Sequence, residues 1–184
     1  MSLTKKLSLS LFSIFILFFI TQLHGQEKFI SGKAKIIDGD SIRIEKHRIR
    51  LLGIDAPEMK QLCKDKNNED YACGHVSKNF LISFIDDVKN LKNLKEVFCY
   101  YSEFDKYNRV LGECFVGPKR IYNLNQAMVL SGHAVAYLRY SDKYLKDQEE
   151  AMIKKKRHVV WRIYFSRRMA VSYTHLTLPT NREV

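Results

Sequence analysis

The sequence lacks several patterns that would assign it to a familiar class. Its four cysteines contain no Cys-x-x-Cys pair, which argues against a zinc site. No loop has the twelve-residue EF-hand pattern with its glycine and terminal glutamate. The chain has three prolines and eight glycines, and no linker rich in Pro, Gly or Ser divides its middle part. The middle of the chain is therefore predicted to form one domain.

The main apolar run is also short. Lys5 and Lys6 precede the segment 7–20, LSLSLFSIFILFFI, whereas a transmembrane helix needs about 20 residues. A charged start followed by such a run is typical of a secretory signal. We therefore assign residues 1–25 to a signal peptide cleaved after Gly25, and predict a secreted or periplasmic protein. The alternative is an uncleaved anchor, the one case in which membrane contact is predicted.

Acidic residues are too few to balance the basic ones. The chain has 31 Lys and Arg against 20 Asp and Glu, which gives a formal net charge of +11. Lys5 and Lys6 contribute +2 of this charge and residues 171–184 contribute none, so the middle of the chain retains +9. Such a surplus attracts polyanions such as nucleic acids, although a basic surface can also serve only solubility.

Several of the scarce carboxylates gather in the segment 37–58, IDGDSIRIEKHRIRLLGIDAPE. Apolar residues alternate at positions 42 and 44 and again at 49 and 51, which predicts two half-buried strands joined by a polar turn. Asp38 and Gly39 form a second turn signal, because glycine accepts the positive φ of a tight turn.

Asp40 lies where the first of these strands begins, and Asp55 and Glu58 follow the second, where Pro57 directs the chain out of the sheet. Carboxylates at neighbouring strand ends suit a hard cation such as Ca²⁺, which takes oxygen ligands. The alternative interpretation is that they are ordinary solvated turn residues.

These motifs resemble the staphylococcal nuclease (thermonuclease) family. IDGDS at 37–41, RLLGIDAPE at 50–58 and DKYNR at 105–109 occur in the family's order, and the resemblance spans about Lys33 to Trp161. It implies an α+β fold, a five-stranded β-barrel of the oligonucleotide-binding (OB) type, and a nuclease domain that we place at 26–161.

The resemblance also implies a Ca²⁺ cofactor held by the carboxylates of Asp40 and Asp55 and by the backbone carbonyl of Ala56. Asp38 and Ser41 match supporting positions around the metal. Ser41 replaces the commoner threonine and keeps its hydroxyl.

Arg50 and Arg109 match the two arginines that grip the scissile phosphate, and Glu58 matches a glutamate that acts on the attacking water. Cations are needed there because phosphodiester hydrolysis builds negative charge on the phosphoryl oxygens. Tyr137 matches the first of the family's two tyrosines near the substrate base, and either Arg139 or Tyr140 would match the second. Tyr107 is a further substrate-binding candidate because it lies in the DKYNR motif. Asn108 replaces the usual glycine of the DKYNR turn and tolerates a left-handed conformation.

Export predicts an oxidising compartment and hence two disulfides. We favour Cys63–Cys73, which closes a polar loop, and Cys99–Cys114, which lie at comparable distances on either side of the DKYNR turn. The second bond would hold the turn that carries Arg109.

Periodicity predicts the remaining elements. Apolar residues between 76 and 88 predict a helix after Gly74, and 96–101 and 110–116 predict two strands. A helix at 122–130 is predicted to end at Gly132, and Ser141 to cap a third helix that runs towards Trp161. The aromatic residues around the second hairpin are interpreted as core, with base stacking as the alternative; they are Tyr100, Tyr101, Phe104, Tyr107 and Phe115.

Two functions remain open at this point: a secreted Ca²⁺-dependent nuclease that cuts DNA and RNA with low sequence preference, leaving 3′-phosphate ends, and a barrel that binds nucleic acid or a peptide without cleavage. A cysteine-rich interaction module is a third idea, but it leaves Arg50 and Arg109 unexplained. A monomer without a protein partner is expected. Residues 162–170 stay an unassigned tail, and 171–184 resemble a translated sequencing adapter and are excluded from the predicted fold.

Overall fold

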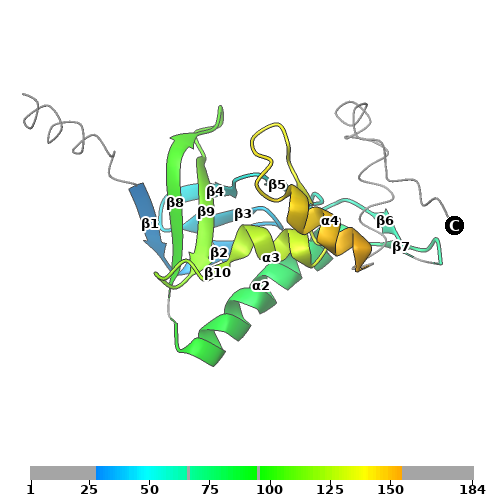
Figure 1. The fold of residues 1–184 in the computed structure, drawn as a ribbon, viewed down its shortest axis with the longest axis horizontal. Helices are drawn as coiled ribbons and strands as arrows, with labels where there is room; N and C mark the ends of the chain where they lie inside the picture. Colours follow the sequence, from blue (N-terminus) through cyan, green and yellow to red (C-terminus); the bar gives the residue numbers. More distant parts are fainter. Residues whose placement is uncertain (1–27, 66, 95, 155–184) are drawn as a thin grey trace, which may run out of the picture.

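The computed structural model describes residues 28–65, 67–94 and 96–154 (Figure 1). The predicted signal peptide, the tail 162–170 and the adapter-like segment 171–184 lie outside the described residues, as does Trp161. Within the described part, none of the helices is long and apolar enough to cross a membrane.

The main structure is a curled, mixed sheet. Its strands follow the order β1 (Lys28–Gly32), β8 (Val97–Phe104), β9 (Val110–Val116), β4 (His47–Leu51), β3 (Ser41–Ile44) and β2 (Ala34–Ile36), with β10 (Tyr122–Asn123) paired to β9. The ladder between β4 and β9 is parallel, and the other ladders in this sheet are antiparallel.

The predicted α+β class is confirmed, but the sheet is a half-barrel. Strands β1 and β2 lie at the two ends of the strand order, and no ladder joins them within the described residues. They follow each other in the chain with Lys33 between them, and they pair with different strands, β1 with β8 and β2 with β3. The closed five-stranded barrel expected from the sequence is therefore not seen in the described part of the chain.

Two short ladders lie beside the main sheet. Strand β5 (Ile54–Asp55) pairs with β11 (Val135–Ala136), which brings the end of the acidic segment next to a segment 80 residues further on. Strand β6 (Cys63–Lys64) pairs with β7 (Asp70–Tyr71) in the disulfide-closed loop.

Within the described residues, helices α2, α3 and α4 pack below and beside the sheet (Figure 1). Helix α2 (Cys73–Lys92) contains the predicted apolar stripe and ends at Asn93, which adopts a left-handed conformation. Helix α3 begins at Leu124, two residues later than predicted, because Tyr122 pairs with β9 and Asn123 caps the helix by accepting from the Gln126 N–H.

Helix α4 (Leu145–Ile153) also begins later than predicted. Ser141 does not cap it; its hydroxyl accepts from the Lys143 N–H in the preceding turn, at 3.1 Å. Tyr144 is the residue before the first helical residue, and its side chain is buried.

Strand alternation separates a core face from an outer face of the sheet. Ile42, Ile44, Ile49 and Leu51 are buried in the core with Leu81 of α2. Residues between them in sequence, on the opposite face, include Arg43, Arg48 and Arg50. The face opposite the core is called the outer face below, and it carries the candidate site.

Candidate functional site

Arg50 joins the two acidic strand ends. Its two terminal nitrogens bind different carboxylates: Nη1 lies 2.6 Å from Asp40 Oδ1, and Nη2 lies 2.7 Å from Asp55 Oδ1. The three side chains come from the start of β3, from β4 and from the end of β5. The structure thus brings together the acids and the arginine that the sequence had placed at two ends of a hairpin.

Asp40 is the most constrained of these groups. It is 4 % exposed, and its carboxylate also accepts from the Ser41 hydroxyl at 3.0 Å and from the Ala56 N–H at 2.9 Å. Burial raises the pKa of Asp40 to about 7, against the lowering effect of Arg50 and of the Ala56 hydrogen bond. A cation placed beside this carboxylate would favour its ionised form.

Asp38 supports the same turn, since its side chain accepts from the Asp40 N–H at 3.1 Å. Gly39 is required for a different reason than predicted, because its φ is not positive. A Cβ at this position would lie 2.2 Å from Ser77 Oγ and 2.7 Å from Ala56 Cβ. Glycine therefore permits the close approach of the acidic turn to α2 and to Ala56.

Arg109 is held by its own turn. Its Nε donates to Asp105 Oδ2 at 2.7 Å, and Asp105 Oδ1 accepts from the backbone N–H groups of Tyr107 and Arg109, both at 2.9 Å. Burial alone would raise the pKa of Asp105, but these hydrogen bonds lower it below its ordinary value. Asn108 adopts a left-handed φ of 57°, as the sequence predicts.

Arg50 lies on the outer face of β4, and Arg109 is the residue just before the neighbouring strand β9. In the parallel ladder Ile49 pairs with Val110, so Arg109 stands beside Arg48, two residues from Arg50 along β4. Two residues of strand correspond to about 7 Å. The register therefore places Arg50 and Arg109 near each other along this pair of strands.

The structure does not bring the Glu58 side chain into this cluster. Glu58 is exposed, and its recorded hydrogen bonds are through the backbone: its N–H donates to Gln61 Oε1 at 3.2 Å, and its carbonyl accepts from the Gln61 N–H. Its carboxylate makes no hydrogen bond or ion pair with another described residue. Glu58 follows Asp55 by three residues with its side chain exposed to solvent.

The two predicted tyrosines lie in different surroundings. Tyr107 is 61 % exposed, with the Arg109 guanidinium 5.5 Å and the Lys106 ammonium 4.9 Å from its ring centre. Tyr137 is half-buried beside the acidic segment, since its N–H donates to the Gly53 carbonyl, and its ring centre lies 5.2 Å from that of Tyr140.

The donor set can be tested for a metal. No group of three or more His, Cys, Asp or Glu side chains in the described ranges is arranged to hold an ion. Two buried carboxylates do converge, however, on one guanidinium, and all their donor atoms are oxygens. With a backbone carbonyl and waters, this set suits Ca²⁺ and not a softer metal. The Ala56 N–H donates to Asp40 Oδ2, which holds Ala56 next to this carboxylate.

Two disulfides are present, and they are the pairs favoured from the sequence. Cys99 and Cys114 are directly opposite each other on β8 and β9, and Cys63 is joined to Cys73 at the start of α2. The described residues contain no free cysteine. Disulfides are consistent with a location outside the cytoplasm.

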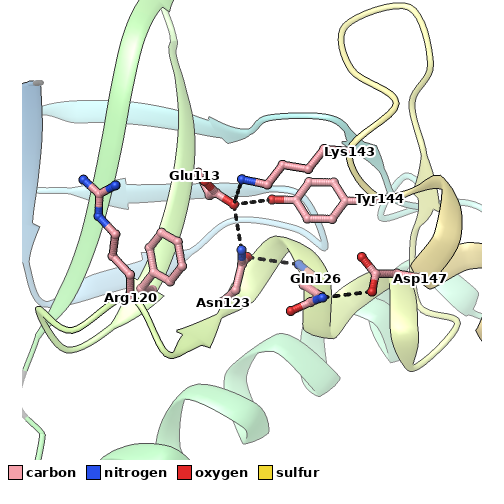
Figure 2. Close-up of a pocket in the computed structure, with 8 residues that line it drawn as sticks. Glu113, Arg120, Asn123, Gln126, Lys143, Tyr144 and Asp147 are labelled. Atoms are coloured by element: carbon pink, nitrogen blue, oxygen red, sulfur yellow. Dashed lines mark hydrogen bonds and ion pairs between the residues drawn. The ribbon is translucent and has the colours of Figure 1, made fainter. Parts of the chain in front are cut away.

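A pocket of about 350 Å³ lies between β9, β10 and the helices α3 and α4 (Figure 2). At its centre Glu113 Oε1 accepts from Lys143, Tyr144 and Asn123, at 2.6, 2.8 and 2.7 Å. Burial would raise the pKa of Glu113, but these three donors lower it below its ordinary value. Burial and the Glu113 charge raise the pKa of Tyr144.

Sequence reasoning missed two residues that build the site. Asp105 was part of the DKYNR motif but received no role, although its spacing of four from Arg109 was a usable signal. Asn125 is fully buried in α3 and joins Cys114, Leu52 and Gly112 by hydrogen bonds, which fix β9 against the end of β4. No local pattern in the sequence distinguishes it.

A comparison against known families identifies the family of this chain. The model of the staphylococcal nuclease homologue family matches residues 48–162, so the chain belongs to this family. The match includes Arg50, Asp55, Glu58 and Arg109, whereas Asp40 lies before its start.

The chain is also similar to proteins that carry different descriptions, one of which is an endonuclease. A protein of Rhizobium meliloti described as a succinoglycan biosynthesis protein is 35 % identical over 58 % of this chain and 51 % of its own length. An uncharacterized endonuclease of Escherichia coli is 36 % identical over 58 % of this chain and 60 % of its own. An uncharacterized protein of Methanocaldococcus jannaschii is 27 % identical over 68 % of this chain and 69 % of its own length. The chain spans about half to three fifths of the first two relatives.

Proposed function

We propose that this protein is a secreted or periplasmic Ca²⁺-dependent nuclease that hydrolyses phosphodiester bonds of single-stranded DNA and RNA with low sequence specificity, leaving 3′-phosphate ends. One observation carries the proposal: Arg50 gathers Asp40 and Asp55, and Arg109 lies just before the neighbouring strand β9. Family membership and the endonuclease description of the Escherichia coli relative support it.

The two arginines would bind the scissile phosphate. A guanidinium donates two parallel hydrogen bonds to phosphate oxygens, which a lysine cannot do. Arg109 suits this role because Asp105 engages its Nε, so that its terminal nitrogens can donate to phosphate oxygens. Charge that grows on the phosphoryl oxygens in the transition state strengthens these contacts, which is the condition for catalysis.

Asp40, Asp55 and the Ala56 carbonyl would hold the calcium ion, with Asp38 and Ser41 keeping Asp40 in place. A bound divalent cation supplies positive charge near the phosphate and lowers the pKa of water. Glu58 would orient the attacking water or accept its proton, because its exposed side chain is able to turn towards a bound substrate. Tyr107 and Tyr137 would pack against nucleotide groups on either side.

The proposal also covers the complete barrel and the location of the protein. We infer an OB-type barrel in which β1 and β2 act as one bent strand around Lys33, since they end the strand order and adjoin in the chain. The two disulfides favour export. The protein would act as a monomer on nucleic acid.

Analysis of cleavage products tests this function. The purified protein is incubated with a 5′-labelled single-stranded oligonucleotide in Ca²⁺, and the fragments are analysed by mass spectrometry. Fragments with 3′-phosphate ends at many positions are expected. Binding of the oligonucleotide without any cleavage would instead support the non-catalytic binding barrel.

A further inference from the structure

We propose that a row of four basic side chains across the outer face, Lys35, Arg43, Arg48 and Arg109, is a track that binds the backbone of a single-stranded nucleic acid leading to the cleavage site. The inference rests on the proposed nuclease function and extends it beyond the scissile phosphate. The row is defined by the sheet register and by no sequence motif.

The register places three of these residues side by side on adjacent strands, and Arg109 is the residue just before the next strand, β9. Lys35 of β2 pairs with Arg43 of β3, and Arg43 pairs with Arg48 of β4. The parallel ladder then sets Arg109 beside Arg48. Neighbouring strands are about 4.8 Å apart, so the row crosses the face at right angles to the strands with one cation at each step.

Lys35, Arg43 and Arg48 are available to a ligand. All three are exposed, and none forms an ion pair with another residue in the described part of the chain. Glu45, two residues after Arg43, lies in the two-residue turn between β3 and β4 and forms no ion pair with these basic residues, and neither does Asp38, three residues after Lys35. Like charges directly opposite on neighbouring strands destabilise a sheet. The row therefore costs stability in the free protein, and a polyanion would remove that cost.

The occupant follows from continuity with the phosphate site. Arg109 ends the row and is also one of the two arginines proposed to grip the scissile phosphate. Arg48 lies two residues from Arg50 on β4, about 7 Å away. A single-stranded nucleic acid bound at Arg50 and Arg109 that continues towards β2 would meet one basic side chain at each β-strand. Backbone-tracking grooves of this kind bind single strands with little sequence preference.

Binding and cleavage by R43Q/R48Q test the track, with K89Q/K92Q as a control that removes the same charge from the last turn of α2. Binding of a labelled 20-nucleotide oligo(dT) is measured by fluorescence anisotropy in chelator, over a range of salt concentrations. We expect R43Q/R48Q to raise Kd about tenfold and to reduce the salt slope by roughly 1.4, or 0.7 for each lost phosphate contact. The control should change Kd by less than about twofold, since screening weakens distant charges.

Thermal unfolding and substrate length complete the test. R43Q/R48Q should melt at the wild-type temperature or above it, because repulsion is relieved, so a lower affinity would not reflect unfolding. The ratio of kcat/KM for the 20-mer to that for a dinucleotide should fall about tenfold. Equal Kd and salt slope in the two double variants would overturn the track. If the wild type cleaves nothing, the nuclease proposal fails while the binding comparison still decides the track.

Discussion

Asp105 and Arg109 are joined across a tight turn by a 2.7 Å contact between Oδ2 and Nε. The other oxygen of Asp105 accepts two backbone N–H groups of the same turn, from Tyr107 and Arg109. One carboxylate therefore shapes the turn and also fixes the plane of the guanidinium.

Asp105→Asn should separate these two roles. The amide oxygen can still accept from the backbone, so we expect a loss of about 1 kcal/mol in stability. The charged contact to Arg109 is lost, and a misplaced guanidinium should lower kcat about tenfold or more. Cleavage rates and thermal melts check this, with Asp86→Asn on the surface of α2 as the control. Wild-type kcat in Asp105→Asn would show that Arg109 needs no such support.

Arg50→Lys keeps the charge but cannot bridge Asp40 and Asp55 with two nitrogens. Both carboxylates are buried, so we expect this variant to lose about 1 to 3 kcal/mol of stability, less than the cost of removing the partner charge altogether. Loss of one phosphate donor should lower kcat about 100-fold or more. Single-turnover cleavage and urea unfolding measure the two effects. A variant with reduced stability and unchanged kcat would assign Arg50 a structural role alone.

Gly39→Ala adds a methyl group where Ser77 Oγ and Ala56 Cβ already stand at 2.2 and 2.7 Å from the new atom. Such overpacking typically costs about 1 to 3 kcal/mol. The acidic turn should also move away from Ala56, so that more Ca²⁺ is needed for half-maximal cleavage. Thermal unfolding and calcium titration check both points. A variant with the same melting temperature as the wild type would contradict the close approach of Gly39 to Ser77 and Ala56.

Glu113→Gln should change how stability depends on pH. The three donors lower the Glu113 pKa in the folded protein below its ordinary value of 4.5. Its ionised form therefore contributes stability at pH values above the unfolded pKa, and that contribution is lost as pH falls through the folded pKa. Melting temperatures of the wild type and variant should differ at pH 7 and converge at low pH. A constant difference would reject the charge as the cause.

Periodicity accounts for much of the fold but not for where helices begin. The strands at Ser41–Ile44 and His47–Leu51 follow from alternation, and the apolar stripe of α2 follows from helical spacing. The starts of α3 and α4 were predicted too early, because tertiary contacts decide them. Tyr122 is drawn into the sheet by β9, and the chain before Leu145 is held by the buried Tyr144.

The acidic cluster could likewise be predicted only in part. Its residues could be named from the motif, but their mutual arrangement depends on β5 meeting β11 and on Gly39 meeting α2. These contacts join segments far apart in the sequence. For the same reason, Asn125 and the Glu113 network could not be predicted, since Asn123, Lys143 and Tyr144 meet only after folding.

The division of labour between acids and arginines is tested most directly by the rate of single-stranded DNA cleavage as a function of Ca²⁺ concentration, in the wild type, Asp55→Asn and Arg109→Lys. We predict that chelation abolishes cleavage by the wild type, that Asp55→Asn shifts half-saturation to higher Ca²⁺, and that Arg109→Lys lowers the plateau without shifting it. Cleavage that persists in chelator, or an Asp55→Asn curve that superimposes on the wild type, would contradict the account.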